Sequence, residues 1–341
     1  MQIVFSILSI VLFWGDVYMT MEGLHGVLHN KPVLTYDVLS GLERRKLLML
    51  FITLNSMPSI LYIDVARIYY GTESGLKVWA IATVSLSILA AFSGFLLVTL
   101  VQYLPPPRFL RHRVATFSAP VFLYASILSV AIAISDEMLT LNLSFNNAPA
   151  GLAFFARGVF WPSGAYTPDG APAAIGHLLP MMWLPVLVSL VGAIVYSKLK
   201  RILEGHVGIV NTEWTTKNTF LSATTVPHWI TSMPLAAHHG IKIGNRTFCK
   251  PSTQVLFGYA SVMPVEASKK VLVAGSVAAA EPDADLISIY DLGWTLVFGA
   301  WLPWHPKRFG TNVKNKFQAP SGDARLLKTR RYIHTRGAAI D

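Results

Sequence analysis

Residues 78–104 form a run of 27 residues without a charged side chain, and this run constrains the fold more than any other feature. As an α-helix it would be roughly 40 Å long, whereas the hydrocarbon core of a bilayer is about 30 Å thick. A surface helix of a soluble domain carries charged or polar residues on its water-facing side. We therefore predict that this segment crosses a membrane.

Four further segments are predicted to span the membrane. Residues 114–134 and 178–197 are uncharged and long enough for a helix to cross. Residues 47–63 barely reach that length, and residues 1–15 are apolar from the first Met. A signal peptide is an alternative for residues 1–15, but a basic n-region and a small-residue cleavage site are missing. The abrupt apolar start also leads us to expect that related chains begin further upstream.

The distribution of charge separates the chain into two regions. Charged residues make up 13% of the chain, whereas a soluble domain carries about 25%. Residues 1–197 hold 10 Lys and Arg against 9 Asp and Glu, and residues 198–341 hold 18 against 9. The sequence therefore predicts an α-helical multi-pass membrane protein with about five spans in residues 1–197. The basic residues 198–341 are predicted to form a cytoplasmic α+β domain.

Lys and Arg in the connectors decide the predicted orientation, because basic connectors stay in the cytoplasm. Residues 16–46 hold four of these side chains and residues 105–113 hold three. Residues 64–77 hold two and residues 135–177 hold one. We therefore predict that 105–113 is a cytoplasmic hairpin, that the amino terminus lies outside and that the basic domain lies inside. Without the first span, the orientation of the later spans is unchanged.

Two glycosylation sequons test this orientation. Asn142 begins an Asn-Leu-Ser sequon in the predicted outside connector, and Asn245 begins an Asn-Arg-Thr sequon in the basic domain. We expect Asn142 to be the glycosylation candidate and Asn245 to remain unmodified.

The basic domain contains signals for strands. Gly244-Asn245 separates two short β-prone runs, which predicts a hairpin. Residues 252–263 are predicted to form a strand within a mostly β unit at 213–291. Residues 277–285 contain Glu-Pro-Asp and are predicted to be a linker or surface loop.

Residues 286–304 are apolar and rich in Trp, but Asp291 interrupts them. We favour a helix lying in the membrane interface, with a buried core segment and a sixth span as alternatives. The basic residues that follow would then face an anionic leaflet. The predicted lipid or partner contacts are Trp294, Trp301, Trp304, Lys307, Arg308, Lys314 and Lys316.

No catalytic, cofactor-binding or metal-binding residue is predicted, and the chain is not expected to be an enzyme. Glu22, His25 and His29 share one helical face and are the strongest metal-site alternative. They are nevertheless more typical of an amphipathic stretch, because only one such cluster exists. Cys249 is the one cysteine, which excludes an internal disulfide, and we expect it to be buried.

A transporter is another alternative. Its kinked spans would be those with Asn55–Pro58 and with Pro180 and Pro185, and the Asp64–Arg67 pair would lie at a boundary. The spans carry no acidic residue at their centres, which argues against coupling to a cation.

Residues 227–263, 286–292 and 306–310 resemble a group of multi-pass membrane proteins from water moulds. The resemblance covers about a third of the chain and lies in the tail region only. It implies that the tail is a folded unit, and it implies no activity or functional residue.

The sequence thus favours a non-enzymatic membrane sensor, adaptor or scaffold. The expected partners are the bilayer and either anionic lipid or a cytoplasmic protein. Nucleic acid is not expected, because no recognition module is present. A transporter or channel and a metal-dependent membrane enzyme remain alternatives, and the plasma membrane is not distinguished from internal membranes.

Overall fold

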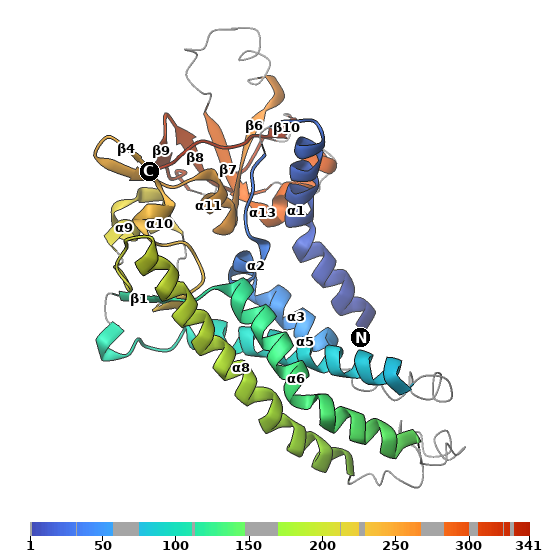
Figure 1. Ribbon diagram of the computed structural model, residues 1–341. Coiled ribbons are helices and arrows are strands. Elements are labelled where there is room, and N and C mark those ends of the chain that lie inside the picture. The colour runs from blue at the N-terminus through green and yellow to red at the C-terminus, as the bar shows by residue number, and fades with distance from the viewer. Residues whose placement is uncertain are drawn as a thin grey trace. The chain divides into compact units, whose positions relative to one another are not determined.

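The computed structural model places most of the chain in two compact units, and each unit combines segments that are distant in sequence (Figure 1). The described residues are 2–31, 33–56, 75–110, 113–146, 170–211, 213–224, 229–266, 283–299, 306–322, 324–327 and 331–341. The helical unit takes in Met1–Ile7, Lys46–Leu104 and Phe117–Gly208. The α+β unit takes in Leu8–Arg45, Pro105–Thr116 and Ile209–Asp341. The units therefore do not divide the chain at residue 197.

Long apolar helices build the helical unit. They are α3 (Lys46–Ser56), α5 (Gly75–Val101), α6 (Ala119–Asn146) and α8 (Gly170–Leu203). Together with α1 (Gln2–Leu28), three of them give four helices in the described chain that are long and apolar enough to cross a membrane. Their qualifying segments are Ile3–Leu28, Thr83–Val101, Ala119–Glu137 and Leu179–Leu203.

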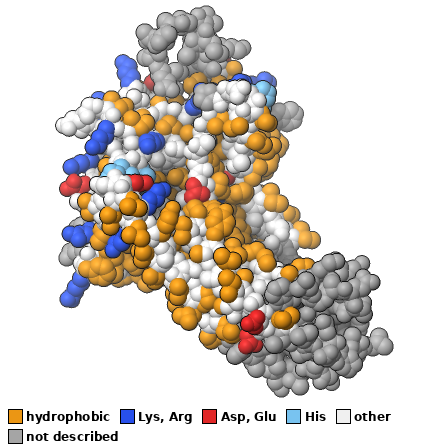
Figure 2. All heavy atoms as spheres, in the orientation of Figure 1, with side chains coloured by type: hydrophobic (Ala, Val, Ile, Leu, Met, Phe, Trp, Pro, Cys, Tyr) orange, Lys and Arg blue, Asp and Glu red, His pale blue; other side chains and the backbone are white. Residues whose placement is uncertain are grey.

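Aromatic and small residues pack α5, α6 and α8 together. Phe95 and Phe122 are fully buried, and their ring centroids lie 5.9 Å apart. Gly94 lets a methyl group of Val186 approach the α5 backbone. Outward-facing residues of α6 and α8 are instead large and apolar, and hydrophobic side chains cover these helices in Figure 2. The helical unit is thus apolar both inside and outside.

The predicted span at 114–134 begins later than expected. Residues Arg113–Thr116 form strand β1, which pairs with β2 (Val210–Asn211) and in parallel with β3 (Ile230–Thr231). The helix starts at Ala119, because Pro120 fits the first turn of a helix. The helix also continues to Asn146, so the predicted connector 135–177 begins as helix.

A five-stranded sheet with the order β10-β6-β7-β8-β9 forms the centre of the α+β unit, and all its neighbouring strands are antiparallel. The strands are β6 (Tyr259–Pro264), β7 (Ala284–Ser288), β8 (Arg308–Val313), β9 (Lys316–Gln318) and β10 (Tyr332–His334). The short helices are α2 (Val38–Gly41), α9 (Glu213–Lys217), α10 (Thr219–Ala223), α11 (Pro251–Leu256) and α13 (Ile289–Val297).

Alternation along the strands supplies two apolar clusters. Ile287 and Val262 belong to a cluster with Met19 of α1 and Leu292 of α13. Leu286, the neighbour of Ile287, belongs to a second cluster with Trp214, Phe220, Leu221, Cys249 and Ile340. The α+β unit therefore has a core of its own.

The predicted Gly244-Asn245 hairpin is confirmed. It joins β4 (Ile241–Ile243) to β5 (Arg246–Phe248), and Gly244 has a φ of +61°. The predicted strand at 252–263 is correct only for its second half, because Pro251 starts helix α11 and the strand begins at Tyr259.

The predicted linker at 277–285 is corrected at its end, because Ala284 and Asp285 already belong to strand β7. Residues 277–282 lie outside the described residues.

Residues 286–304 do not form one interfacial helix or a sixth span. Leu286 and Ile287 lie in the central strand β7 and are fully buried. Ser288 then accepts a hydrogen bond from the backbone N–H of Tyr290 and caps the nine-residue helix α13. The buried-core alternative therefore fits residues 286–299, and residues 300–305 lie outside the described residues.

Helix α1 contributes to both units. Within the helical unit, Phe5 stacks on Phe51 at 5.8 Å between ring centroids. Within the α+β unit, Met19 is buried in the sheet core and Gly15 lies against the backbone of Ile289. The predicted helix at 1–15 is confirmed and continues to Leu28.

Two glycines of α1 give a matched test of this packing. A Cβ atom at Gly15 would overlap the carbonyl oxygen of Ile289, whereas one at Gly23 would have no heavy atom within 4 Å. We expect Gly15→Ala to lower the free energy of unfolding by about 1–3 kcal/mol through overpacking. Gly23→Ala should raise it by up to about 1 kcal/mol through helix propensity. Thermal unfolding of the full chain in detergent measures both, and equal effects would contradict the packing of α1 on α13.

Candidate functional site

A two-stranded ribbon at one edge of the five-stranded sheet carries most of the predicted contact residues. We call residues 306–322 and 324–326 the basic ribbon. β8 and β9 are joined by Lys314 and Asn315, whose φ angles are +48° and +65°, as in the two-residue turns that suit the twist of a hairpin. Beyond β9, Arg325 forms an antiparallel bridge with Lys307, the residue just before β8.

The described residues of the basic ribbon carry five cationic side chains and no acidic one, and Asp323, which falls between them in the sequence, lies outside the described residues. Arg308 points its guanidinium at Asp285 of β7, at 3.3 Å, and Asp285 also accepts a hydrogen bond from the Thr311 hydroxyl at 3.1 Å. Arg308 is therefore engaged within the sheet, although we predicted it as a contact residue. The remaining four cationic side chains are exposed: Lys307, Lys314, Lys316 and Arg325.

Arg325 is a cationic residue of the basic ribbon that sequence reasoning did not single out. It lies nine positions after Lys316, and only the antiparallel pairing with Lys307 brings it onto the basic ribbon. The pairing signal is weak in the sequence, because residues 319–322, which follow β9, form no regular strand.

Aromatic side chains fasten the basic ribbon to the core. Phe309 stacks on Tyr259 at 3.9 Å between centroids, and Phe317 lies 5.8 Å from the ring of the fully buried Phe220. Gly310 is required opposite Phe317, because a Cβ atom there would overlap that ring. The cationic side chains therefore stand on a rigid support.

Of the three predicted Trp contacts, the structure describes only Trp294. Its ring lies 6.2 Å from that of Trp14 and stacks on Phe298 at 5.4 Å. Trp294 therefore takes part in the packing of α13 against α1 within the α+β unit. Trp301 and Trp304 lie outside the described residues.

A buried charge cluster lies in the middle of the apolar helix α1. One carboxylate oxygen of Asp16 accepts a hydrogen bond from the Tyr36 hydroxyl at 2.7 Å and forms ion pairs with Arg44 and Arg45. Asp16 and Arg45 are each 1% exposed. Burial lowers the pKa of Arg45 to about 10 and raises that of Tyr36 to about 12, so both keep their usual charge at neutral pH.

Glu43 forms a second buried carboxylate site. Its oxygens accept hydrogen bonds from the Thr231 hydroxyl at 2.7 Å and from the backbone N–H and the hydroxyl of Ser232, both at 2.6 Å. Glu43 is 1% exposed. Sequence reasoning missed both carboxylate sites, because their partners lie far away along the chain.

The metal alternative gains no support from the geometry. Tyr18 donates to Glu22 at 3.3 Å, and the Nδ1 atom of His29 lies 2.8 Å from the carbonyl oxygen of His25. These three predicted ligands are not among the groups of described residues whose ligand atoms all lie within 4.8 Å of one another.

Cys249 is fully buried, as predicted, and burial raises the pKa of its thiol.

The structure describes only some of the residues on which the transporter alternative depends. Pro180 and Pro185 lie inside helix α8, and Ser189 hydrogen-bonds across to Ser129 of α6 at 3.0 Å. This contact is a pairing of two small hydroxyls between otherwise apolar helices. Residues Pro58, Asp64 and Arg67 lie outside the described residues.

The two sequons occupy different structures. Asn142 lies in helix α6, whereas an acceptor sequon is normally found in a surface loop. Asn245 lies in the exposed turn between β4 and β5. Asn142 lies beyond the candidate span Ala119–Glu137, in the helical start of the predicted connector, and its glycosylation stays a prediction.

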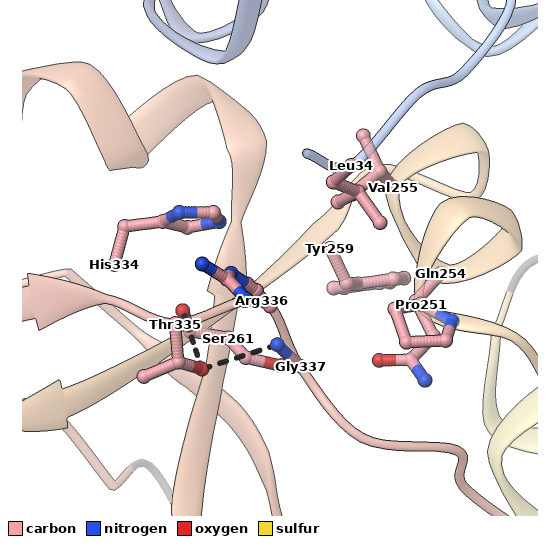
Figure 3. Close-up of a pocket in the computed structure, with 10 residues that line it drawn as sticks. All are labelled: Leu34, Pro251, Gln254, Val255, Tyr259, Ser261, His334, Thr335, Arg336 and Gly337. Atoms are coloured by element: carbon pink, nitrogen blue, oxygen red, sulfur yellow. Dashed lines mark hydrogen bonds between the residues drawn. The ribbon is translucent and has the colours of Figure 1, made fainter. Parts of the chain in front are cut away.

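A shallow hollow opens beside the strand β10 (Figure 3). Its space of about 160 Å³ is lined on one side by His334 and Arg336 and on another by Pro251 and Gln254. Thr335 donates to the carbonyl oxygen of Ser261 at 3.4 Å, which ties the lining together.

Comparisons with protein-family models, with curated proteins and with solved structures found no match for this chain. The resemblance to water-mould membrane proteins therefore stays a prediction.

His334 gives the α+β unit a predicted pH dependence. Burial lowers its pKa to about 4, whereas an unfolded histidine has a pKa of about 6.5. Between these two pH values, His334 is protonated in the unfolded chain but neutral in the folded chain. The free energy of unfolding therefore falls as the pH decreases from about 6.5 to about 4, by at most about 3 kcal/mol.

We expect His334→Gln to lose less stability than the wild type over this interval, measured by denaturant unfolding of the full chain in detergent. Glu22, the acidic neighbour that opposes the shift, is present in both proteins and is thereby controlled. An identical pH dependence in both would contradict the assignment.

Proposed function

We propose that this chain is a multi-pass integral membrane protein whose α+β unit lies in the cytoplasm. The compact α+β unit gathers Leu8–Arg45, Pro105–Thr116 and Ile209–Asp341. These segments largely overlap the regions 16–46, 105–113 and 198–341, which the distribution of Lys and Arg assigns to the cytoplasm. A contact-based unit and a charge-based rule are independent, so their agreement supports the topology. It holds whether or not residues 1–15 cross the membrane.

We further propose a non-enzymatic function as a membrane adaptor or scaffold, with the basic ribbon as its contact surface. The observation that carries this proposal is the set of four exposed cationic side chains on the basic ribbon, whose described residues include no acidic side chain. Each Lys or Arg near an anionic leaflet contributes about 1 kcal/mol to binding. The ribbon therefore has enough charge to hold anionic lipid headgroups.

The lipid contact can be tested by amine labelling of the full chain in nanodiscs. We expect Lys314 and Lys316 to react several-fold more slowly in discs with phosphatidylserine than in discs with phosphatidylcholine alone, because headgroups shield them. High salt should remove the difference by screening. Lys217 of α9, with a side chain 76% exposed, is the matched control outside the ribbon.

Equal labelling of the ribbon lysines in both kinds of disc would contradict lipid contact. Slower labelling of Lys217 to the same degree would show a general effect of the discs rather than contact by the ribbon.

The topology can be tested at the exposed turn of the β4–β5 hairpin. Asn245 is exposed there, so the fold does not block its glycosylation. A cytoplasmic location would keep it unmodified, because the glycosylation enzymes act on the opposite side of the membrane. We expect no glycan at Asn245 when the full chain is made in a eukaryotic secretory system, measured by glycosidase digestion of the wild type and of Asn245→Gln. As a control, a sequon inserted in the connector 147–169 should be glycosylated. A glycan on Asn245 would place the α+β unit outside.

A further inference from the structure

Residues 335–341 cross the α+β unit as an extended segment, which we call the tail strand. Its backbone pairs with Cys249 in both directions, through N–O distances of 2.7 and 3.1 Å. At the next residue, Asp341 accepts from the N–H of Phe317 and donates to the carbonyl oxygen of Asn315. The tail strand therefore lies between the end of β5 and the edge strand β9.

Side-chain amides hold the carbonyl groups of the tail strand. Asn218 donates to the carbonyl oxygen of Ile340 at 3.1 Å, and Gln254 donates to that of Ala338 at 2.7 Å. Both amides are almost fully buried, with 1% and 2% of their surface exposed. Recognition of main-chain carbonyls by fixed amide groups is independent of the side chains in the bound segment.

At three positions of the tail strand, the surrounding residues constrain which side chain fits. Ile340 is fully buried in the cluster of Trp214 and Phe220. Asp341 forms an ion pair with Arg246 at 2.9 Å. Gly337 has a φ of +72°, and a Cβ atom there would lie 3.0 Å from the Ser261 hydroxyl, so a side chain would be strained. The start of this path lines the hollow in Figure 3.

The two amides that hold the tail strand in its seat also have partners outside that strand. The Asn218 amide also donates to the carbonyl oxygen of Thr247 at 3.2 Å, and its oxygen caps α10 through the N–H of Leu221. The Gln254 amide also donates to the carbonyl oxygen of Cys249 at 3.1 Å. Each amide thus retains a partner, and removal of the tail strand leaves neither wholly unpaired.

We propose that this seat is a peptide-binding groove, and that the tail strand is an exchangeable occupant. Its ligand is an extended protein segment with glycine, two small residues, an aliphatic residue and an acidic residue in succession. Binding adds a strand at an open edge, and the aliphatic and acidic residues give specificity. The tail strand competes with such a partner segment for the groove.

Cys249 is a built-in reporter of occupancy. It is the sole cysteine of the chain, is fully buried and pairs directly with Ile340. A thiol under the tail strand should react slowly, and it should react faster when the groove is empty. The test uses the full chain in nanodiscs and a thiol-reactive probe.

We expect Ile340→Asp to release the tail strand and to increase the rate of Cys249 modification by about tenfold or more, because burial no longer protects the thiol. A synthetic peptide with the sequence of residues 335–341 should restore protection. A matched peptide with Ser at the position of Ile340 should not. Reactive Cys249 that neither peptide protects would overturn the proposal and leave the tail strand as a fixed part of the core.

If Ile340→Asp fails to fold, a second test exchanges the charges of the Arg246–Asp341 ion pair. Fluorescence anisotropy of labelled peptides with the folded wild-type chain should show stronger binding of the acidic peptide than of one with Lys at the position of Asp341. The preference should reverse in Arg246→Asp, a substitution at a side chain that is 64% exposed. Binding of neither peptide to either protein, or a preference that does not change, would overturn the proposal.

Discussion

Apolar side chains on the outer faces of α6 and α8 impose the constraint on which the rest of the structure depends. Leu128 and Ile132 of α6 are 64% and 68% exposed, and Leu184 and Val188 of α8 are 66% and 62% exposed. Exposed apolar area costs roughly 25 cal/mol per Å² in water. A bilayer removes this cost, whereas it would penalise the charges of the α+β unit. The two units thus differ in the solvent that suits their surfaces, and the sequence alternates between the two units several times.

The buried carboxylate of Asp16 explains why the second half of helix α1 belongs to the α+β unit. Its length and composition satisfy the requirements for a membrane span, yet Asp16 lies in its middle. An isolated carboxylate would be costly in hydrocarbon or in a dry core. The Tyr36 hydroxyl and the guanidinium groups of Arg44 and Arg45 engage this carboxylate. These partners draw residues 36–45 to α1, and the second half of α1 becomes part of the sheet core.

The sequence predicted the long apolar helices, the β4–β5 hairpin and four of the five cationic residues on the basic ribbon. These features depend on local composition or on turn chemistry. It failed where long-range pairing decides the structure. Residues 114–116 were predicted to be helical because they are apolar, but they pair with strands about 95 and 115 residues away in the chain, contacts that local propensity does not contain. Residues 286–288 were misassigned for the same reason, and the contacts of Ile340 with Cys249 leave no sequence signal.

Membrane association of the full chain tests the central claim most directly. After expression, membranes are washed with alkaline carbonate and high salt, which remove proteins held only by charge. The account predicts that the chain stays in the membrane pellet and enters solution only with detergent. Recovery of a monodisperse, folded chain in the wash without detergent would contradict it, because the outer faces of α6 and α8 would then be compatible with water.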